Sequence, residues 1–321
     1  MAVYTKLTEQ EIAQHLQNYS LGKLLSFKEI IEGIDNSNFI IKTTEGKFIL
    51  TIFEARINKN ELQFFLNLKL HLAKNGVLCP RPILDNSGAT ITKIKEKESV
   101  IVTFLSGSTL RARDDGYYDS ISAQHCFGVG KNLAKLHEAA KDFSMSRVND
   151  LGILGWQKLF SRFADKIENY QPNLGEEINK TLTFLHESWN KSLPSCACHL
   201  DLFPDNVFFD QSNNFSGAID FYFAANDAAI YDFAIIVNAW CFDEKNNFSE
   251  EKFSAMLNGY EEVRKFSEDE KEFLKIALIG AAMRFLLTRL NDMFFTPKEA
   301  LVKIKNPQEY LTKLRFFSGK L

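Results

Sequence analysis

Apolar and polar residues alternate along much of the first third of the chain, and this period of two predicts β-strands. The alternating segments are 26–32, 38–43, 47–53, 89–94 and 99–104. Short polar turns join the first three of them. Strands connected by such short turns pair in the antiparallel sense, so we expect an antiparallel sheet in this part of the chain.

Segments with helical spacing accompany these strands. Thr8 and Glu11 form a capping box ahead of a short leading helix. Asn60 can cap a longer helix that ends at Gly76. After a Ser-Gly-Ser hinge at 106–108, helical spacing continues almost to the end of the chain. The predicted helices are about 119–140, 155–169, 176–191, 228–242, 250–263, 268–291 and 307–316.

A run of strands followed by a run of helices predicts an α+β fold. The first lobe, residues 1–106, is an antiparallel β-sheet lobe that carries one helix, and the second lobe, residues 107–321, is mostly helical. The length agrees with two lobes, because 321 residues exceed the size at which a single core stops growing.

Composition and charge exclude several classes of protein. Apolar residues make up 45% of the chain and charged residues 25%, which is typical of globular proteins and not of disordered ones. The net charge of −3 gives no basic face for nucleic acid. The N-terminus has no apolar core of a signal peptide, and no apolar stretch is long enough to span a membrane. We therefore expect a soluble cytoplasmic protein without nucleic-acid or membrane partners.

The cysteines do not have the spacing of a metal site. There are five of them, and the only close pair is Cys196 and Cys198, a C-x-C pair with no CxxC or suitably spaced histidine beside it. We expect free, reduced thiols.

The segment 198–223 contains the candidate chemistry. Two short apolar runs, 207–209 and 217–219, are joined by a turn-rich stretch and should pair as an antiparallel hairpin. Asn206 precedes the first run and Asp220 follows the second, so pairing brings them to the same end of the hairpin, roughly 5 Å apart at the backbone. Asp201 lies in the loop just before. Hard oxygen ligands without His or Cys suit Mg²⁺ held together with substrate phosphates.

This set of residues is what phosphoryl transfer from ATP requires, namely a base for the acceptor hydroxyl and a metal for the phosphates. The alternative is that His199, Asp201 and Asp205 only form turns and that Asp220 only caps a strand. The ordered pattern H-x-D-x₄-N, hairpin, I-D-F in a helical lobe behind a β-lobe favours function. The P-loop pattern G-x₄-GK[ST] is missing from the sequence.

His199-Leu200-Asp201, Asn206 and Asp220-Phe221 resemble the aminoglycoside-phosphotransferase and choline-kinase branch of the protein-kinase-like fold. Further strings, over roughly residues 24 to 300, are similar to the bacterial homoserine kinases of this fold. These strings are 35–39, 50–54, 79–82, 219–223 with 226–227, and 231–241. The resemblance implies a bilobal kinase that uses ATP and Mg²⁺ to phosphorylate the side-chain hydroxyl of L-homoserine in threonine biosynthesis.

The resemblance also implies roles for individual residues. Asp201 would be the catalytic base, and Asn206 and Asp220 would be the Mg²⁺ ligands. Asp232 would be a buried acid that holds the catalytic loop, with His199 beside it behind the reacting groups.

The β-lobe would bind the nucleotide. The residues expected to cover the ATP phosphates are Gly33, Asn36, Ser37 and Asn38, and those expected along adenine are Val102, Thr103 and Phe104. Thr51 stands where kinases of this fold usually place a phosphate-binding lysine. The cation is therefore open, with Lys42 and Arg56 the nearest candidates.

A zwitterionic acceptor needs a cation for its carboxylate and an anion for its ammonium. Arg284 lies among small residues of a very apolar helix, where a buried charge must be paired, so it is the candidate cation. A structural ion pair to Asp227, Asp232 or Glu262 is the alternative. Asp205 and Asp227 are candidates for the ammonium or simple turn caps, and Trp240 is a pocket wall or a core residue.

Two other readings stay open. A related kinase would act on choline, ethanolamine, hydroxylysine or an aminoglycoside, although choline calls for an aromatic cage and an aminoglycoside for an acidic rim. A member of another class would be an inactive nucleotide-binding scaffold, which only Thr51 favours. The sequence leaves the oligomeric state open.

Overall fold

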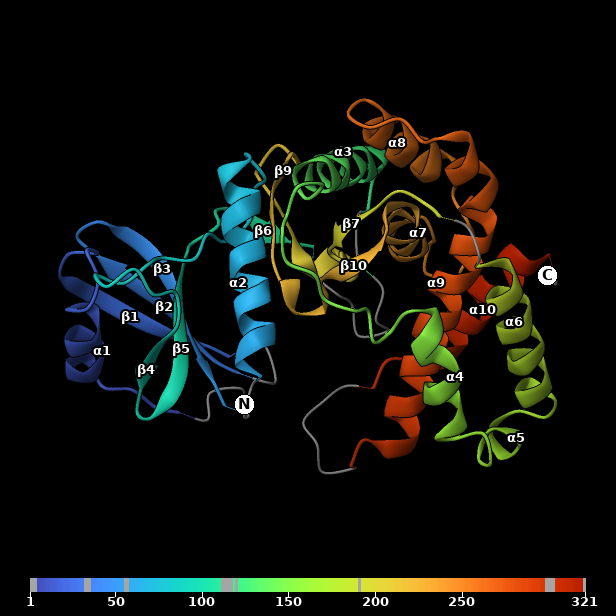
Figure 1. Ribbon diagram of the computed structural model, residues 1–321, viewed down its shortest axis with the longest axis horizontal. Helices are drawn as coiled ribbons and strands as arrows, with labels where there is room; N and C mark the ends of the chain where they lie inside the picture. Colours follow the sequence, from blue (N-terminus) through green and yellow to red (C-terminus); the bar gives the residue numbers. More distant parts are fainter. Residues whose placement is uncertain are drawn as a thin grey trace. The chain divides into compact units, whose positions relative to one another are not determined.

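The fold is described over residues 5–31, 36–54, 58–110, 118, 121–189, 192–297 and 304–319 in a computed structural model. The chain divides into two units, Met1–Ser106 and Gly107–Leu321 (Figure 1). The first unit is built on an antiparallel sheet and the second is mostly helical, so the predicted fold class is confirmed.

The alternating segments of the first unit form the predicted sheet. Its strands are β1 (Leu24–Ile30), β2 (Asn36–Thr43), β3 (Gly46–Phe53), β4 (Thr92–Ile94) and β5 (Lys97–Thr103). They pair antiparallel in the order β1-β2-β3-β5-β4. The strand predicted over 89–94 is shorter than expected, because the turn at Asp85 continues to Ala89.

Two helices belong to the same unit. Helix α1 (Glu9–Leu16) begins with the predicted capping box of Thr8 and Glu11. Helix α2 (Lys59–Lys74) begins two residues earlier than expected, so Asn60 is inside the helix and is not its cap.

The core of the first unit lies between α1 and one face of the sheet. Phe39, Ile41 and Leu50 are buried there against Ile12 and Leu16 of the helix. Because side chains alternate along a strand, the residues between them point to the opposite face.

The second unit consists mainly of helices. They are α3 (Ala123–Ala139), α4 (Ile153–Ser161), α5 (Ile167–Tyr170), α6 (Leu174–Ser188), α7 (Ala229–Trp240), α8 (Glu250–Glu261), α9 (Glu268–Phe295) and α10 (Pro307–Ser318). The helix predicted over 155–169 is divided into α4 and α5, and the other predicted helices are present with shifted ends. Residues 119 and 120 lie outside the described part.

Short strands support the chemistry-bearing segment of this unit. They are β6 (Ser108–Thr109), β7 (Ser195–Cys198), β8 (Val207–Phe209), β9 (Phe215–Ala218) and β10 (Ala225–Ala228). The predicted hairpin is confirmed as β8 and β9, with Val207 opposite Ala218. The antiparallel pair of β7 and β10 was not predicted.

Close helix packing fixes the frame around these strands. Helix α7 is almost entirely buried and packs against α3 and α9. Helices α3 and α8 lie side by side (Figure 1), where a Cβ atom on Gly130 would come 2.1 Å from the carbonyl oxygen of Met256. Gly130 is therefore a packing residue. Among the described residues, no helix combines the length and apolar character needed to cross a membrane.

Candidate active site

The segment from His199 to Asn206 connects β7 to β8, and one buried carboxylate fixes its backbone. Asp232 on α7 accepts hydrogen bonds from the backbone amides of His199 and Leu200, both at 2.8 Å. Leu200 has a φ of +64°, a left-handed conformation that is uncommon for leucine and places both amides toward the same acceptor. Asp232 thus has the loop-holding position that the sequence predicts for it.

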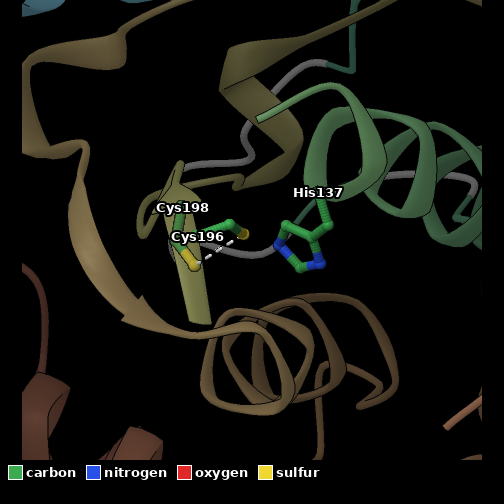
Figure 2. Close-up of side chains that lie close together, drawn as sticks. All are labelled: His137, Cys196 and Cys198. Carbon is green, nitrogen blue, oxygen red and sulfur yellow. Dashed lines mark hydrogen bonds between the residues drawn. The ribbon is translucent and has the colours of Figure 1, made fainter. Parts of the chain in front are cut away.

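His137 on α3 points toward β7 (Figure 2) and supports Asp232. Its Nε2 atom lies 3.0 Å from Asp232 Oδ2, and its Nδ1 atom lies 2.7 Å from the hydroxyl of Tyr260. Burial by itself would raise the pKa of Asp232, but the hydrogen bond and charge of His137 outweigh it, and the pKa lies below its usual value. Asp232 is therefore a carboxylate when it accepts the two amides.

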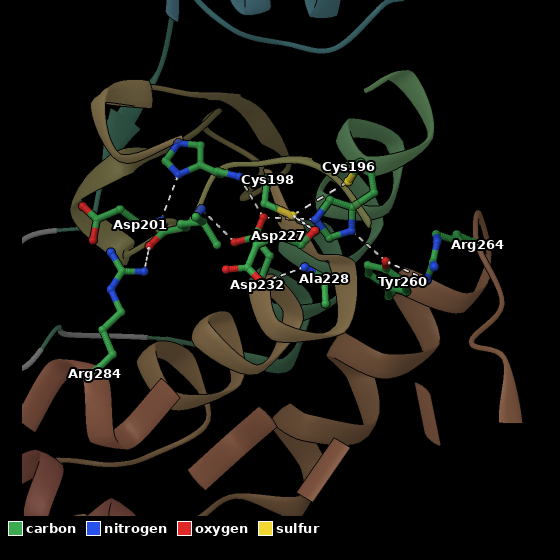
Figure 3. Close-up of polar contacts among 12 residues, drawn as sticks. Cys196, Cys198, Asp201, Asp227, Ala228, Asp232, Tyr260, Arg264 and Arg284 are labelled. Carbon is green, nitrogen blue, oxygen red and sulfur yellow. Dashed lines mark hydrogen bonds and ion pairs between the residues drawn. The ribbon is translucent and has the colours of Figure 1, made fainter. Parts of the chain in front are cut away.

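The network continues from Tyr260 to Arg264 (Figure 3). Arg264 donates to the Tyr260 hydroxyl at 3.1 Å and to Glu270 at 2.7 Å. Through these contacts the segment 199–206 is connected to α3, α7, α8 and α9. The role of His137 could not be predicted from the sequence, because a single histidine in an amphipathic helix gives no local signal of a partner so far along the chain.

Asp201 lies at the centre of the segment. Its backbone amide donates to Nδ1 of His199 at 3.2 Å, and Nε2 of His199 donates to the carbonyl of Ile219 at 2.9 Å. Burial raises the pKa of Asp201 to about 7, with the neighbouring carboxyls of Asp220 and Asp205 adding to the shift and Arg284 opposing it. A carboxyl group with such a pKa is a suitable proton acceptor near neutral pH.

Asn206 and Asp220 flank the hairpin as the sequence predicts. The Nδ2 atom of Asn206 donates to the carbonyl and the carboxylate of Asp201, at 2.8 and 3.2 Å. This orientation leaves the Oδ1 atom of Asn206 as the ligand oxygen. The backbone of Ile219 bonds to Asn206, and Asp220 follows with a φ of +63°. The carboxyl of Asp220 and the amide oxygen of Asn206 are hard oxygen donors of the kind that Mg²⁺ prefers.

Arg284 on α9 approaches the same segment from the other side (Figure 3). The side chain is buried, and Nη1 donates to the carbonyl of Leu200 at 2.7 Å. Each of the three acids considered as a structural ion-pair partner of Arg284 has other partners. Asp232 bonds to His137 and to two backbone amides, Asp227 bonds to Asn149, and Glu262 pairs with Lys131. The Nε atom of Arg284 is buried and has no hydrogen-bond partner among the described residues.

The other candidate acceptor residues differ in accessibility. Asp205 is exposed and lies 3.8 Å from the ammonium of Lys305. Asp227 accepts from Asn149 at 2.6 Å, and burial raises its pKa. Trp240 is fully buried and donates from Nε1 to the carbonyl of Leu202 at 2.8 Å, so it is a core residue and not a pocket wall.

A cavity of about 160 Å³ opens beside Phe203, two residues after Asp201. Its lining is mostly charged and includes Arg289, Lys305, Glu309 and Lys313. A small polar molecule with charges of both signs suits this lining.

In the sheet unit, the expected phosphate-facing residues point in opposite directions. Asn38 shares a face with Thr51, whose Oγ1 donates to Asn38 Oδ1 at 2.8 Å. Ser37 points to the α1 side, where its Oγ accepts from the amide of Thr5 at 3.0 Å and donates to Glu54. Only the backbone of Ser37 therefore remains for a nucleotide. Gly33 lies outside the described residues, and Asn36 begins β2.

No described candidate replaces the lysine expected at Thr51. Lys42 is paired in register with Lys47, four residues along β2 from Asn38, which is about 13 Å. Lys97 bonds to Glu54 on the α1 side of the sheet. Arg56 lies outside the described residues.

The residues expected along adenine already use several backbone groups. The amide of Thr103 donates to the carbonyl of Arg81 at 2.9 Å, and the amide of Phe104 donates to that of Lys47 at 3.3 Å. Val102 forms a bridge with Pro82. The Thr103 and Phe104 amides are therefore not available to adenine in this conformation.

Comparisons with known proteins identify the family of the chain. The model of the phosphotransferase enzyme family matches residues 26–266. The chain is 44% identical over 316 residues to a homoserine kinase of Sinorhizobium fredii, covering 98% of this chain and 94% of the relative. It is also 44% identical over 319 residues to a homoserine kinase of Parvibaculum lavamentivorans, covering 99% of this chain and 97% of the relative.

Solved structures share the fold at lower identity. An amicoumacin kinase, determined in complex with AMP-PNP, Ca²⁺ and Ami, superposes with a TM-score of 0.70 at 15% identity, covering 98% of this chain and 94% of that one. A microcompartment-associated aminopropanol kinase superposes with a TM-score of 0.69 at 16% identity, covering 98% of each chain.

Proposed function

The chain belongs to the phosphotransferase enzyme family, and from this membership and its homoserine kinase relatives we propose that it transfers the γ-phosphoryl group of ATP to the side-chain hydroxyl of L-homoserine. The product, O-phospho-L-homoserine, belongs to threonine biosynthesis, and we place the reaction in the cytoplasm. The observation that carries the proposal is the catalytic segment, in which Asp201 and Asn206 are hydrogen-bonded to each other and Asp232 fixes the backbone.

Asp201 is the proposed general base. It takes the proton of the acceptor hydroxyl as the oxygen attacks the γ-phosphorus. The hydrogen bond from Asn206 fixes the orientation of the carboxyl, and the raised pKa of Asp201 matches a group that must hold a proton briefly near neutral pH.

Asn206 and Asp220 are the proposed ligands of the metal ion. A bound Mg²⁺ neutralises charge on the transferring phosphoryl group. Asn206 offers its Oδ1 atom because its Nδ2 atom is held by Asp201, and Asp220 offers a carboxylate at the other edge of the hairpin.

The acceptor is proposed to bind beside Asp201, between Arg284 and the charged cavity. Arg284 retains an unpartnered Nε among the described residues, and its guanidinium would hold the carboxylate of homoserine. Asp205, which is exposed at the same segment, is the better candidate for the ammonium, because Asp227 is already bonded to Asn149 and to the Ala228 amide.

The test measures ADP release with Mg·ATP across L-homoserine, ethanolamine, choline, hydroxylysine and an aminoglycoside, with phosphorylated product identified by mass spectrometry. We expect L-homoserine to give the highest kcat/KM, since a site built for two charges rejects analogues that lack one by up to roughly 10⁴-fold. Equal kcat/KM for ethanolamine would contradict the acceptor assignment and leave the kinase assignment in place.

The inactive-scaffold alternative predicts a different result. A scaffold would bind Mg·ATP and release no ADP with any acceptor. If the wild-type protein binds Mg·ATP but phosphorylates nothing in the panel, the proposed function is wrong. A threonine at position 51 in place of the usual lysine then fits an inactive scaffold.

A further inference from the structure

Three side chains with soft ligand atoms lie together behind the catalytic segment. Cys196 and Cys198 occupy alternate positions of β7 and therefore share one face of the strand, and His137 of α3 points at them (Figure 2). Their ligand atoms all lie within 4.8 Å of one another. The relative exposures of the residues are 7%, 0% and 1%. The two cysteines have no role in the reaction proposed above, and His137 is connected to it only through its contact with Asp232.

We propose that His137, Cys196 and Cys198 form a binding site for one soft cation of the d¹⁰ class, such as Zn²⁺, Cd²⁺ or Cu⁺. This inference does not rest on the proposed function, because it depends only on the geometry of the three side chains.

The spacing of the two sulfur atoms fits a metal ion between them. They lie 3.8 Å apart. Two thiolates bound to one tetrahedral ion with metal–sulfur distances of about 2.3 Å are separated by about 3.8 Å. The pair therefore needs no backbone movement to hold an ion.

The chemistry of the pair also favours a soft cation. Thiolate is the metal-binding form of cysteine. The hydrogen bond from Cys198 lowers the pKa of Cys196 to about 7, in spite of burial, and His137 and Arg264 contribute in the same direction. Burial raises the pKa of Cys198, so an ion that binds both sulfurs must displace the Cys198 proton. Two sulfurs and an imidazole nitrogen select thiophilic ions and do not suit Mg²⁺. The metal site proposed here is therefore distinct in ligand chemistry from Asn206 and Asp220.

Occupation of this site has a consequence for the catalytic segment. Both ring nitrogens of His137 have partners, Asp232 on one side and Tyr260 on the other. An ion bound through the imidazole must replace one of these contacts. Since Asp232 holds the amides of His199 and Leu200, and β7 leads directly into His199, we expect binding of the ion to slow the enzyme.

The binding test uses Cd²⁺ with the full-length protein, reduced and freed of metal by a chelator that is then removed. Titration should produce the ultraviolet thiolate-to-cadmium charge-transfer band and saturate at one equivalent, confirmed by native mass spectrometry. Because all three side chains are buried, each addition is given time to equilibrate. Cys196→Ser and Cys198→Ser should each weaken Cd²⁺ binding by about tenfold or more.

Cys79→Ser is the matched control, since Cys79 is also buried but lies in the sheet unit. It should bind Cd²⁺ like the wild type. Circular dichroism checks that each variant is folded. Three results would each overturn the proposal. They are the absence of a charge-transfer band in the wild type, a band that survives in the Cys196→Ser/Cys198→Ser double variant, and a disulfide between the two cysteines that persists after treatment with a reductant.

The activity test separates this site from the Mg²⁺ site. One equivalent of Cd²⁺ in excess Mg·ATP should lower kcat of the wild type and leave the double variant unchanged. Equal inhibition of both proteins would assign the effect to Asn206 and Asp220 and would overturn the predicted action on the catalytic segment. The Cd²⁺ band is measured without ATP or acceptor, so its outcome is independent of the proposed reaction.

Discussion

Glu309 on α10 connects two buried cations, and its removal is the sharpest stability test that the structure offers. Its carboxylate accepts from Arg289 of α9 at 2.6 Å and from Lys313 at 2.5 Å. The side chains of Arg289, Glu309 and Lys313 are 9%, 17% and 3% exposed. The perturbation is Glu309→Gln, which keeps the size of the side chain and removes its charge.

The magnitude follows from the titration of the group. Burial would raise the pKa of Glu309, but the charges of Lys313 and Arg289 outweigh it and bring the pKa from 4.5 to about 2. Such a fall corresponds to about 3 kcal/mol of stabilisation of the charged form in the folded state. Removing one partner of a buried ion pair costs about 3–5 kcal/mol. We therefore expect Glu309→Gln to lower the free energy of unfolding by about 3 kcal/mol at pH 7.

The assay is urea unfolding followed by tryptophan fluorescence. All three tryptophans, Trp156, Trp189 and Trp240, belong to the helical unit, so the signal reports on the unit that contains Glu309. Glu176→Gln is the matched control, because Glu176 forms an ion pair with Lys180 in which both side chains are exposed. It should leave the unfolding midpoint unchanged.

The stability difference between wild type and Glu309→Gln should change with pH in a direction that follows from the lowered pKa. A depressed pKa in the folded state gives stability that is present above pH 4.5 and is lost as the pH falls from 4.5 toward 2. The difference between wild type and Glu309→Gln should therefore shrink by about 1 kcal/mol between pH 7 and pH 4. Adding Lys313→Met to Glu309→Gln removes a buried unpaired ammonium and should restore part of the loss. A destabilisation below about 1 kcal/mol at pH 7, with an unchanged m value, would refute the reasoning.

Three further predictions concern the reaction. Asp201→Asn should lower kcat by roughly 10²–10⁴-fold and leave the Kd of Mg·ATP nearly unchanged; a variant with more than about half of the wild-type kcat would remove Asp201 from the base role. Asp220→Ala should abolish activity and weaken Mg²⁺-dependent nucleotide binding, more than Asn206→Ala does, because a charged ligand is lost; unchanged binding measured by calorimetry would exclude the metal role of Asp220. Arg284→Lys should raise the KM for L-homoserine, because a point charge replaces a planar fork. A fall in kcat at constant KM would instead identify Arg284 as an anchor of the Leu200 carbonyl alone.

Local patterns were enough to predict the hairpin of the catalytic segment. The short apolar runs at 207–209 and 217–219 are joined by a turn-rich connection, so the pairing that brings Asn206 and Asp220 together is determined by short-range sequence. Capping boxes are equally local, and that of Thr8 and Glu11 is present as predicted.

Contacts between distant segments could not be predicted in this way. The pairing of β7 with β10 and the approach of His137 to Cys196 depend on how helices pack, and no residue near them in the sequence reports it. The residues next to Cys196 and Cys198 in the sequence therefore give no sign of His137 as a third ligand.

The direction in which a side chain points was also hard to predict from the sequence. Ser37 was expected at the phosphates because it lies in the right turn, but its place in the alternation of β2 sends its hydroxyl to Glu54 on the α1 side. Trp240 was left open between pocket and core, and its burial in α7 follows from the packing of that helix against its neighbours.

The left-handed conformations at Leu200 and Asp220 have a consequence for protein engineering. Each is strained by about 1–3 kcal/mol relative to ordinary backbone, and the strain persists because Asp232, Arg284 and the hairpin hold the segment around it. Glycine would relieve the strain at either position, and it would also let the segment visit other shapes. The Leu200 side chain is fully buried, and its removal would cost about 2–5 kcal/mol, more than the strain it relieves, so directed evolution for thermal tolerance alone should keep leucine there. At Asp220, which is exposed, the same selection should enrich Asp220→Gly and lose turnover, whereas selection on growth should keep the carboxylate.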